Sequence, residues 1–425
     1  MKRLLIALFV AVALICLANI IAFEDVPAAV IEEQLDEVER VAMPINSINF
    51  DDTNYLDLKH LDTILEGVRI VMLGERTHQD GQTFVAKSRL IRYLHERLGY
   101  RVVLYEAGQF DMWMMNQTME SSDADGLGVS VGGIGLFDFW WANEETKPLI
   151  DYYLASKKTP SPIELGGFDI QFTGSLLNER RSRLIREFLQ KNEIDLQDYA
   201  IVNDHVDDLP RLAYNMIANR RLDADQKSRF LQDLRHLERA VSQLEPTEEN
   251  TMYQRYFNDV RHNLRKSWSF ETGSEESMNF RDSLMAQNLI YQIDSLYTNQ
   301  KVVIWCSNIH TFSRRYSKAY RPMGAYIKEK YADASYMLNF TSFAREDSKG
   351  NLVDKPGKFA VENVFHRRNL PYFMIDLRGL SVNTFLKDEF VSNLNQGIDE
   401  EKAWTHYIDG IFYIDINQNP TYPEE

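Results

Sequence analysis

The sequence predicts an α/β protein, with a central and mostly parallel β-sheet that is flanked by helices and carries a large helical insertion. Short apolar runs that end in glycine or a polar residue alternate with helical segments along most of the chain. Between about residues 175 and 299 the sequence is instead helical and heavily charged. The chain has 425 residues, of which 44% are hydrophobic, so it can bury a sizeable core.

The expected strands are short runs of mostly apolar residues, as in buried parallel sheets. They are predicted over residues 69–74, 101–106, 163–170, 301–306, 334–343, 372–377 and 410–414. A helix is expected over 84–98, because Ile91, Leu94 and Leu98 fall on one face. The helical stretch at 175–299 is expected to pack over one end of the sheet.

The N-terminus begins with Lys2 and Arg3, which precede an apolar run over residues 4–23. This pattern predicts an export signal or a membrane anchor over residues 1–23, separate from the fold. The length of the run favours a retained anchor, while Ala18 and Ala22 keep cleavage open. We therefore expect an exported, periplasmic or other extracytoplasmic protein that touches a membrane only through this segment. An arm over residues 24–54 and one domain over 55–425 would follow.

Charge and cysteine content argue against a nucleic-acid-binding protein and against a fold held by disulfides. The formal net charge is −16 and no long block of Lys or Arg occurs, so nucleic acid is not expected as a partner. Only Cys16 and Cys306 are present, and Cys16 lies in the export segment, so an intrachain disulfide in the domain is excluded. We expect a small-molecule partner and a fold held together by its core.

Four predicted strand ends carry titratable side chains. The first strand runs into Glu75 and His78, and the second ends at Glu106. The third leads to Asp169, and the strand at 301–306 leads to His310. Because the carboxyl ends of parallel strands meet at one edge of a sheet, these groups are expected to form one site.

Six motifs resemble those of the erythromycin esterase family, and they occur in order along most of the chain. They are GERTH at 74–78, FWWANE at 139–144, GFDIQ at 167–171, RDSLMAQN at 281–288, WCSNIH at 305–310 and DGIFYI at 409–414. The resemblance implies that the domain at 55–425 hydrolyses an ester or a lactone, in the family's named members a macrolide lactone, with an activated water.

The resemblance also implies roles for individual residues. His78 would be the general base, oriented together with the water by Glu75 and Glu106. His310 would polarise the carbonyl group or protonate the leaving alkoxide. Lys87 stands where family members often carry an arginine, which removes a planar fork and puts macrolide specificity in doubt. Lys87, Arg281 and Asp169 are assigned to substrate binding.

Arg281 is also placed by helical geometry. In a helix expected from about 278 to 297, an apolar stripe is formed by Met285, Leu289, Ile293 and Leu296. Arg281 stands one turn before Met285 on that stripe, so its cation should point inward and require a carboxylate. Glu75 and Glu106 are the preferred partners, and Asp169 is the third.

Three alternatives remain open. A serine hydrolase would use Ser130 in the G-x-S-x-G pattern of 128–132, but no strand is expected before it, which favours a mobile loop over 126–135. The tryptophans at 140 and 141, which follow this loop, are expected in the core or in a pocket wall. A metal hydrolase would use the Glu75, His78, Glu106 and His310 set to bind a divalent ion, although no H-E-x-x-H helix supports it and no resident cofactor is expected. An exported binding protein would keep this fold without catalysis.

Overall fold

The computed structural model describes residues 28–121, 124–214, 222–381 and 383–423. The predicted export segment at 1–23 lies outside these residues. Within the part of the chain that is described, no helix is both long and apolar enough to cross a membrane. Residues 28–41 form helix α2 (Ala28–Val41), which buries Val38 against the domain.

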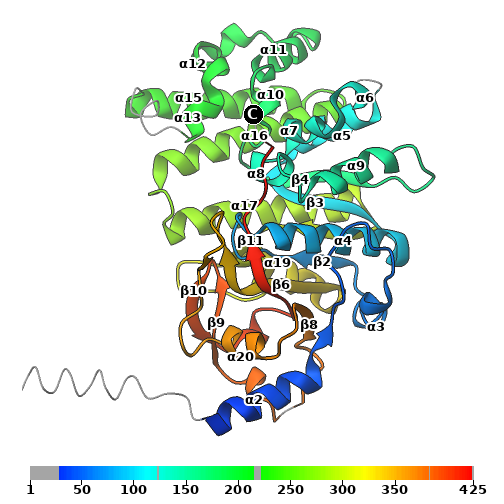
Figure 1. Cartoon of the computed structure of the whole chain (residues 1–425). Coiled ribbons are helices and arrows are strands. Elements are labelled where there is room, and N and C mark those ends of the chain that lie inside the picture. Colours follow the sequence, from blue (N-terminus) through cyan, green and yellow to red (C-terminus); the bar gives the residue numbers. More distant parts are fainter. Residues whose placement is uncertain (1–27, 122–123, 215–221, 382, 424–425) are drawn as a thin grey trace, which may run out of the picture.

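A nine-stranded sheet forms the centre of the molecule and confirms the predicted fold class (Figure 1). Its order is β1-β8-β11-β6-β2-β5-β3-β4, with β7 paired to β6. All neighbours from β11 to β4 are parallel, whereas β8 runs antiparallel to β11, β1 to β8, and β7 to β6. The strands are β1 (Met43–Pro44), β2 (Ile70–Leu73), β3 (Tyr100–Gly108), β4 (Glu164–Asp169), β5 (Lys301–Trp305), β6 (Ser335–Glu346), β7 (Leu352–Val353), β8 (Tyr372–Asp376) and β11 (Gly410–Gln418).

Each face of the central strands is buried against a different layer, as the two-residue period of a strand requires. Val71 and Leu73 of β2 join the cluster that contains Phe84 of helix α4 (Gly81–Leu98). Ile70 and Met72 face the opposite way, into a cluster with residues of helices α17 (Glu275–Tyr291) and α19 (Met323–Tyr331). This double burial explains why the strands read as continuous apolar runs.

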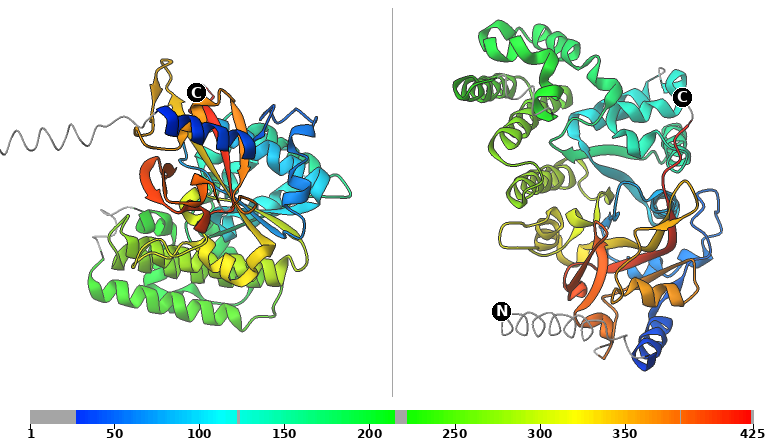
Figure 2. Two further views of the ribbon diagram at one scale, coloured as in Figure 1. Left: turned by 90° about the horizontal axis from the view of Figure 1, so that it is seen from below. Right: turned by 60° about the vertical axis from the view of Figure 1, so that its left-hand side comes forward.

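The charged stretch after β4 consists of helices, which lie together at the top of Figure 1. They are α10 (Ser175–Asn178), α11 (Arg181–Lys191), α12 (Ala200–His205), α13 (Leu209–Tyr214), α15 (Ala224–Ser242) and α16 (Glu248–Ser269). Helices α15 and α16 have N-cap side chains: Asp223 accepts a hydrogen bond from the backbone N–H of Gln226, and Thr247 accepts one from that of Asn250. In Figure 2 the green helices gather on one side of the molecule, so this layer is distinct from α17, which lies on the sheet.

The glycine-rich segment is not the open loop that its composition suggests. It forms short helical turns, α6 (Ala124–Leu127), η2 (Gly128–Val131) and α7 (Gly132–Gly135). A Cβ on Gly132 would lie 2.6 Å from Trp141, and one on Gly135 would lie 2.8 Å from Met112. These two glycines therefore allow close packing. Ser130 sits in a 3-10 turn that no strand precedes, so it does not have the context of a nucleophile elbow.

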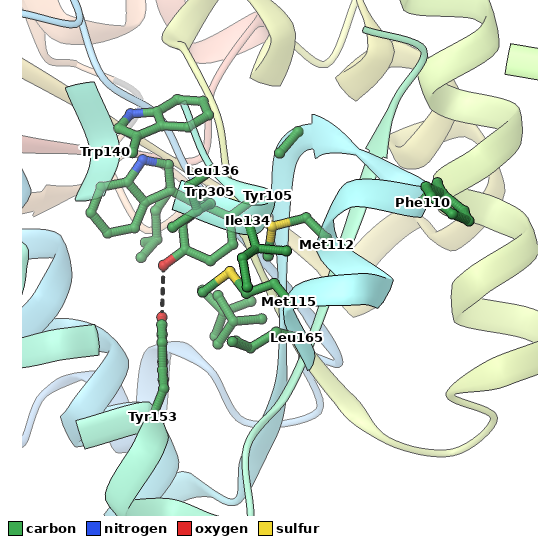
Figure 3. Packing of buried hydrophobic residues seen from close by; sticks show 14 of the residues in the cluster. Tyr105, Phe110, Met112, Met115, Ile134, Leu136, Trp140, Tyr153, Leu165 and Trp305 are labelled. Atoms are coloured by element: carbon green, nitrogen blue, oxygen red, sulfur yellow. Dashed lines mark hydrogen bonds between the residues drawn. The ribbon is translucent and has the colours of Figure 1, made fainter. Parts of the chain in front are cut away.

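The packing at this point includes several aromatic rings. Figure 3 shows Trp140, from helix α8 (Asp138–Trp141), among Leu136, Tyr105 and Trp305. Trp140 is 1% exposed and is part of the hydrophobic core. A small second sheet, β9 (Phe390–Asn395) with β10 (Ile398–Lys402), and the short strands β1 and β7 were not expected from the sequence.

Candidate active site

The four strand ends singled out in the sequence belong to adjacent strands, in the order β2-β5-β3-β4. The chain passes from β2 through α4 to β3 and later returns to place β5 between them. Side chains that follow these strands therefore converge at one edge of the sheet, where ligands bind in parallel α/β folds. The site draws on residues separated by more than 200 positions.

A close contact joins the loops after β2 and β5. A Cβ on Gly74 would lie 2.1 Å from Asn308 Oδ1, so only glycine fits there. The Asn308 backbone N–H donates to the carbonyl oxygen of Glu75 at 2.8 Å. The Asn308 amide group also donates to the carbonyl oxygens of Phe340 and Leu394, both at 2.8 Å. These bonds fix the backbone that carries Glu75 and, two residues past Asn308, His310.

Glu75 is fully buried, and both of its carboxylate oxygens are occupied. Oε1 lies 2.7 Å from His78 Nδ1 and accepts from Trp140 Nε1 at 2.9 Å. Oε2 accepts from Lys87 Nζ at 2.8 Å. A buried carboxylate requires such partners. These contacts hold the Glu75 carboxylate in place with one oxygen directed at the histidine.

His78 is the accessible member of this group, because 40% of its side chain is exposed. Its Nδ1 faces Glu75, which sets the tautomer with the proton on Nδ1 and leaves Nε2 as the basic nitrogen. Burial on one side lowers the pKa of His78, but the hydrogen bond and charge of Glu75 outweigh it and raise the pKa above its ordinary value. The charge of Glu106 acts in the same direction.

Arg281 lies at the centre of a second group and confirms the predicted salt bridge. Its Nε and Nη2 donate to the two oxygens of Asp169 at 3.0 and 2.6 Å, and Nη2 also donates to Glu106 Oε1 at 2.7 Å. The predicted order of partners is wrong: Asp169, placed third, receives the two-pronged contact, and Glu75 is paired with Lys87 instead. Arg281 is 15% exposed.

His310 is enclosed by carboxylates and is only 6% exposed. Its Nδ1 lies 2.8 Å from Asp282 Oδ1, and its Nε2 lies 3.2 Å from Glu106 Oε1. Burial lowers the pKa of His310, but Asp282 and Glu106 raise it to about 10. The ring is then an imidazolium that donates from both nitrogens, so its 3.3 Å contact with Arg281 Nη1 is not a hydrogen bond.

Glu106 links the two cations. Burial raises the pKa of Glu106, but the neighbouring His310 and Arg281 hold it well below its ordinary range. Oε2 accepts from the backbone N–H of Ser307 at 3.0 Å. Glu106 is therefore an anion that holds Arg281 and His310 next to each other.

Two residues assigned to substrate binding are covered. Lys87 and Asp169 are both 0% exposed, so they reach the site through Glu75 and Arg281. The Lys87 ammonium lies 4.1 Å from the centre of the Trp305 ring, and burial lowers the pKa of Lys87 despite the nearby Glu75. In this structure Lys87 thus contacts Glu75 and Asp169 contacts Arg281, and neither side chain is exposed.

Sequence reasoning missed two residues of the site. Asp282 accepts from His310, from Met323 N at 2.8 Å and from the Tyr320 hydroxyl group at 3.3 Å. Its position directly after Arg281 on α17 was the available signal. Trp140 was read as core or pocket wall, and its indole N–H bonds Glu75 as well. No local pattern indicates that contact, which spans 65 positions.

The acids and histidines of the site are the residues that could bind a divalent metal ion. Among the residues that the structure describes, no group of three or more His, Cys, Asp or Glu side chains has a metal-binding arrangement. The acids are engaged by Lys87, Trp140 and Arg281, and protonated His310 offers no lone pair. The residues do not fit a metal ion in this arrangement.

Comparisons with known proteins identify one family model and several similar proteins. A family model described as erythromycin esterase matches residues 95–414, which include Glu106, Asp169, Arg281 and His310 and begin after His78. The Bacillus subtilis protein named "Putative hydrolase YbfO" is 25% identical over 84% of this chain and 83% of its own length. The Escherichia coli erythromycin esterase type II is 21% identical over 70% of this chain and 74% of its own length. A solved structure of an erythromycin esterase mutant in its open conformation has a TM-score of 0.63, 17% identity, and coverage of 88% of this chain and 97% of that chain.

Proposed function

Because the chain belongs to the erythromycin esterase family and is a hydrolase by that kinship, we propose that it cleaves an ester or lactone bond with a water activated by His78. One observation carries the proposal. The exposed His78 ring is tied to a buried carboxylate through Nδ1, and the Arg281–Glu106–His310 group lies at the same sheet edge. A base, and a cationic donor for the carbonyl oxygen, are the two elements that ester hydrolysis needs.

The proposed reaction follows from the protonation states. His78 Nε2 takes a proton from water, and the resulting hydroxide attacks the carbonyl carbon. Glu75 stabilises the imidazolium that forms. Arg281 donates to the carbonyl oxygen as it becomes negative, and the charge of the neighbouring His310 ring adds to this stabilisation, while Glu106 holds both cations in place. When the carbon–oxygen bond breaks, the proton on His78 passes to the leaving alkoxide, which gives a carboxylic acid and an alcohol.

The substrate that we propose is an uncharged ester or lactone, with a macrolide as one candidate. The E. coli relative carries the name of a macrolide esterase, which supports testing such lactones. We further propose that the protein acts outside the cytoplasm, because Lys2 and Arg3 precede an apolar run that reads as an export segment.

The test is to incubate the purified full chain with macrolides, other lactones and simple esters, and to follow the products by mass spectrometry. We expect at least one product that is heavier than its substrate by one water, with equal yield in the presence of a metal chelator. Failure of the whole panel, combined with tight binding of a panel member, would favour a binding protein. Loss of activity with the chelator, restored by a divalent ion, would favour a metal hydrolase.

A further inference from the structure

The exposed face of the site contains a stacked series of three rings. His78 lies over Phe139 with ring centres 4.4 Å apart and planes inclined by 17°. Phe139 in turn lies over Phe137 at 5.0 Å and 14°. Both phenylalanine rings are partly exposed, whereas Trp140 beside them is buried. The general base of the proposed reaction is therefore the first member of an aromatic surface that extends away from it.

This surface is held rigidly relative to the base. Trp140 lies between the phenylalanines and Glu75, since it meets both rings edge-on and donates its indole N–H to the acid. Gly132 and Gly133, which precede the aromatic segment, leave room for the Trp141 side chain: a Cβ on Gly132 would lie 2.6 Å from its Cβ, and one on Gly133 would lie 2.8 Å from its ring. On the other side, the backbone at Glu144 donates to Thr421 O at 2.9 Å. Rings fixed in this way lose little entropy when a ligand covers them.

The aromatic and the cationic parts of the site have different chemistry. Arg281, His310 and Glu106 suit a carbonyl group, whereas Phe137 and Phe139 offer only apolar surface near the base. Partly exposed aromatic rings beside a catalytic group are what an apolar ligand would cover. A charged acyl or alcohol group would lose hydration there without a partner.

We propose that Phe137 and Phe139 bind the apolar part of the substrate, so that the enzyme prefers esters or lactones with a bulky hydrocarbon or aromatic group over small esters. This inference rests on the proposed function and names its substrate class. Phe137 is the specificity-determining residue to test, because it contacts Phe139 and Trp140 while His78 stacks on Phe139.

The kinetic test compares 2-naphthyl acetate with methyl acetate in the unmodified chain and in Phe137→Ala. We expect the ratio of the two kcat/KM values to fall roughly tenfold in Phe137→Ala, through KM for the naphthyl ester. The matched control is Phe359→Ala, which removes an exposed phenylalanine elsewhere on the surface (54% exposed) and should leave the ratio unchanged. An unchanged ratio in Phe137→Ala, with both esters hydrolysed, would overturn this inference and leave the proposed function standing.

A binding test separates the inference from catalysis. Calorimetry with 2-naphthol, the alcohol product, should show binding to the unmodified chain and roughly tenfold weaker binding to Phe137→Ala. Equal binding by both proteins, or none by the unmodified chain, would overturn the aromatic surface as a ligand site. If naphthol binds as expected and no ester is hydrolysed, the proposed function fails and the binding surface stands.

Discussion

His78 and His310 each face a buried carboxylate through Nδ1, at 2.7 and 2.8 Å, yet 40% of the His78 side chain is exposed and only 6% of His310. The acid beside His78 shares its charge with Lys87. His310 instead has a carboxylate at each ring nitrogen, Asp282 and Glu106. The two rings thus have the same kind of partner and different charge balances.

The pKa of a histidine therefore depends on how many carboxylates contact the ring and on which other cations those carboxylates contact. One shared carboxylate raises the pKa of His78 above its ordinary value and leaves Nε2 of the exposed ring as the nitrogen that can accept a proton. Two carboxylates bring the pKa of His310 to about 10, so that ring is a fixed cation. The proposed reaction uses His78 as the base and His310 as the fixed positive charge.

The largest expected effect is on the base. His78→Ala should lower kcat by about two to four orders of magnitude, because the group that activates the water is lost. His366→Ala is a matched control, since His366 is also half-exposed, lies 2.7 Å from Asp415 and stacks on Phe343. Steady-state kinetics of both variants decides the point, and near-normal turnover in His78→Ala would end the assignment.

Arg281→Ala should reduce the free energy of unfolding by about 3–5 kcal/mol, because Glu106 and Asp169 would stay buried without their cation. The exposed pair of Arg183 and Glu187 provides the control, and Arg183→Ala should cost less than about 1 kcal/mol. Urea denaturation measures both. If the two variants lost equal stability, Arg281 would not be the buried counter-ion that the geometry shows.

The pH profile tests His310. Activity should rise with pH as His78 deprotonates and fall as His310 loses its proton near pH 10. Asp282→Asn removes one anion, which lowers the pKa of His310 and should move the alkaline limb down by at least about one unit. Because the raised pKa belongs to the folded state, the stability that His310 contributes is complete below about pH 6.5 and is lost as the pH rises toward 10. An alkaline limb that does not move in Asp282→Asn would contradict the cationic role.

The smallest expected effect is that of Ser130→Ala. Ser130 lies in a 3-10 turn without the strand of a nucleophile elbow, and the account uses water as the nucleophile. The variant should therefore keep most of the parental kcat, and a fluorophosphonate should not label Ser130. A folded but inactive Ser130→Ala would favour Ser130 as the nucleophile and contradict a water activated by His78.

The sequence predicted the main sheet because its strands are buried on both faces and read as apolar runs. It could not predict β9, where Ser392 and Asn393 are buried and bond Glu362 from a distant helix. The predicted stripe is correct for Met285 and Leu289 of α17 and for Ile293 just after it, which are all 0% exposed. It fails at Leu296, because the helix continues as a π-helix over Gln292–Leu296 and the period changes.

Much of the site could also be predicted, because strand ends of a parallel sheet meet at one edge. The pairing of the charged residues in the site could not be predicted, because it depends on which groups are buried side by side. Lys87 was assigned to the substrate, yet it is enclosed beneath Glu75, and that leaves Arg281 to Asp169 and Glu106. Asp282 was visible in the sequence only as the neighbour of Arg281.

The most direct measurement is a titration of the histidine rings by nuclear magnetic resonance, with the His78 and His310 signals among the nine histidines identified through single variants. We expect His78 to titrate above its ordinary value of 6.5 but to lose its proton before His310, which should stay protonated until about pH 10. A His310 ring that is neutral at pH 8, or a His78 ring that stays protonated as long as His310, would contradict the division into base and cation.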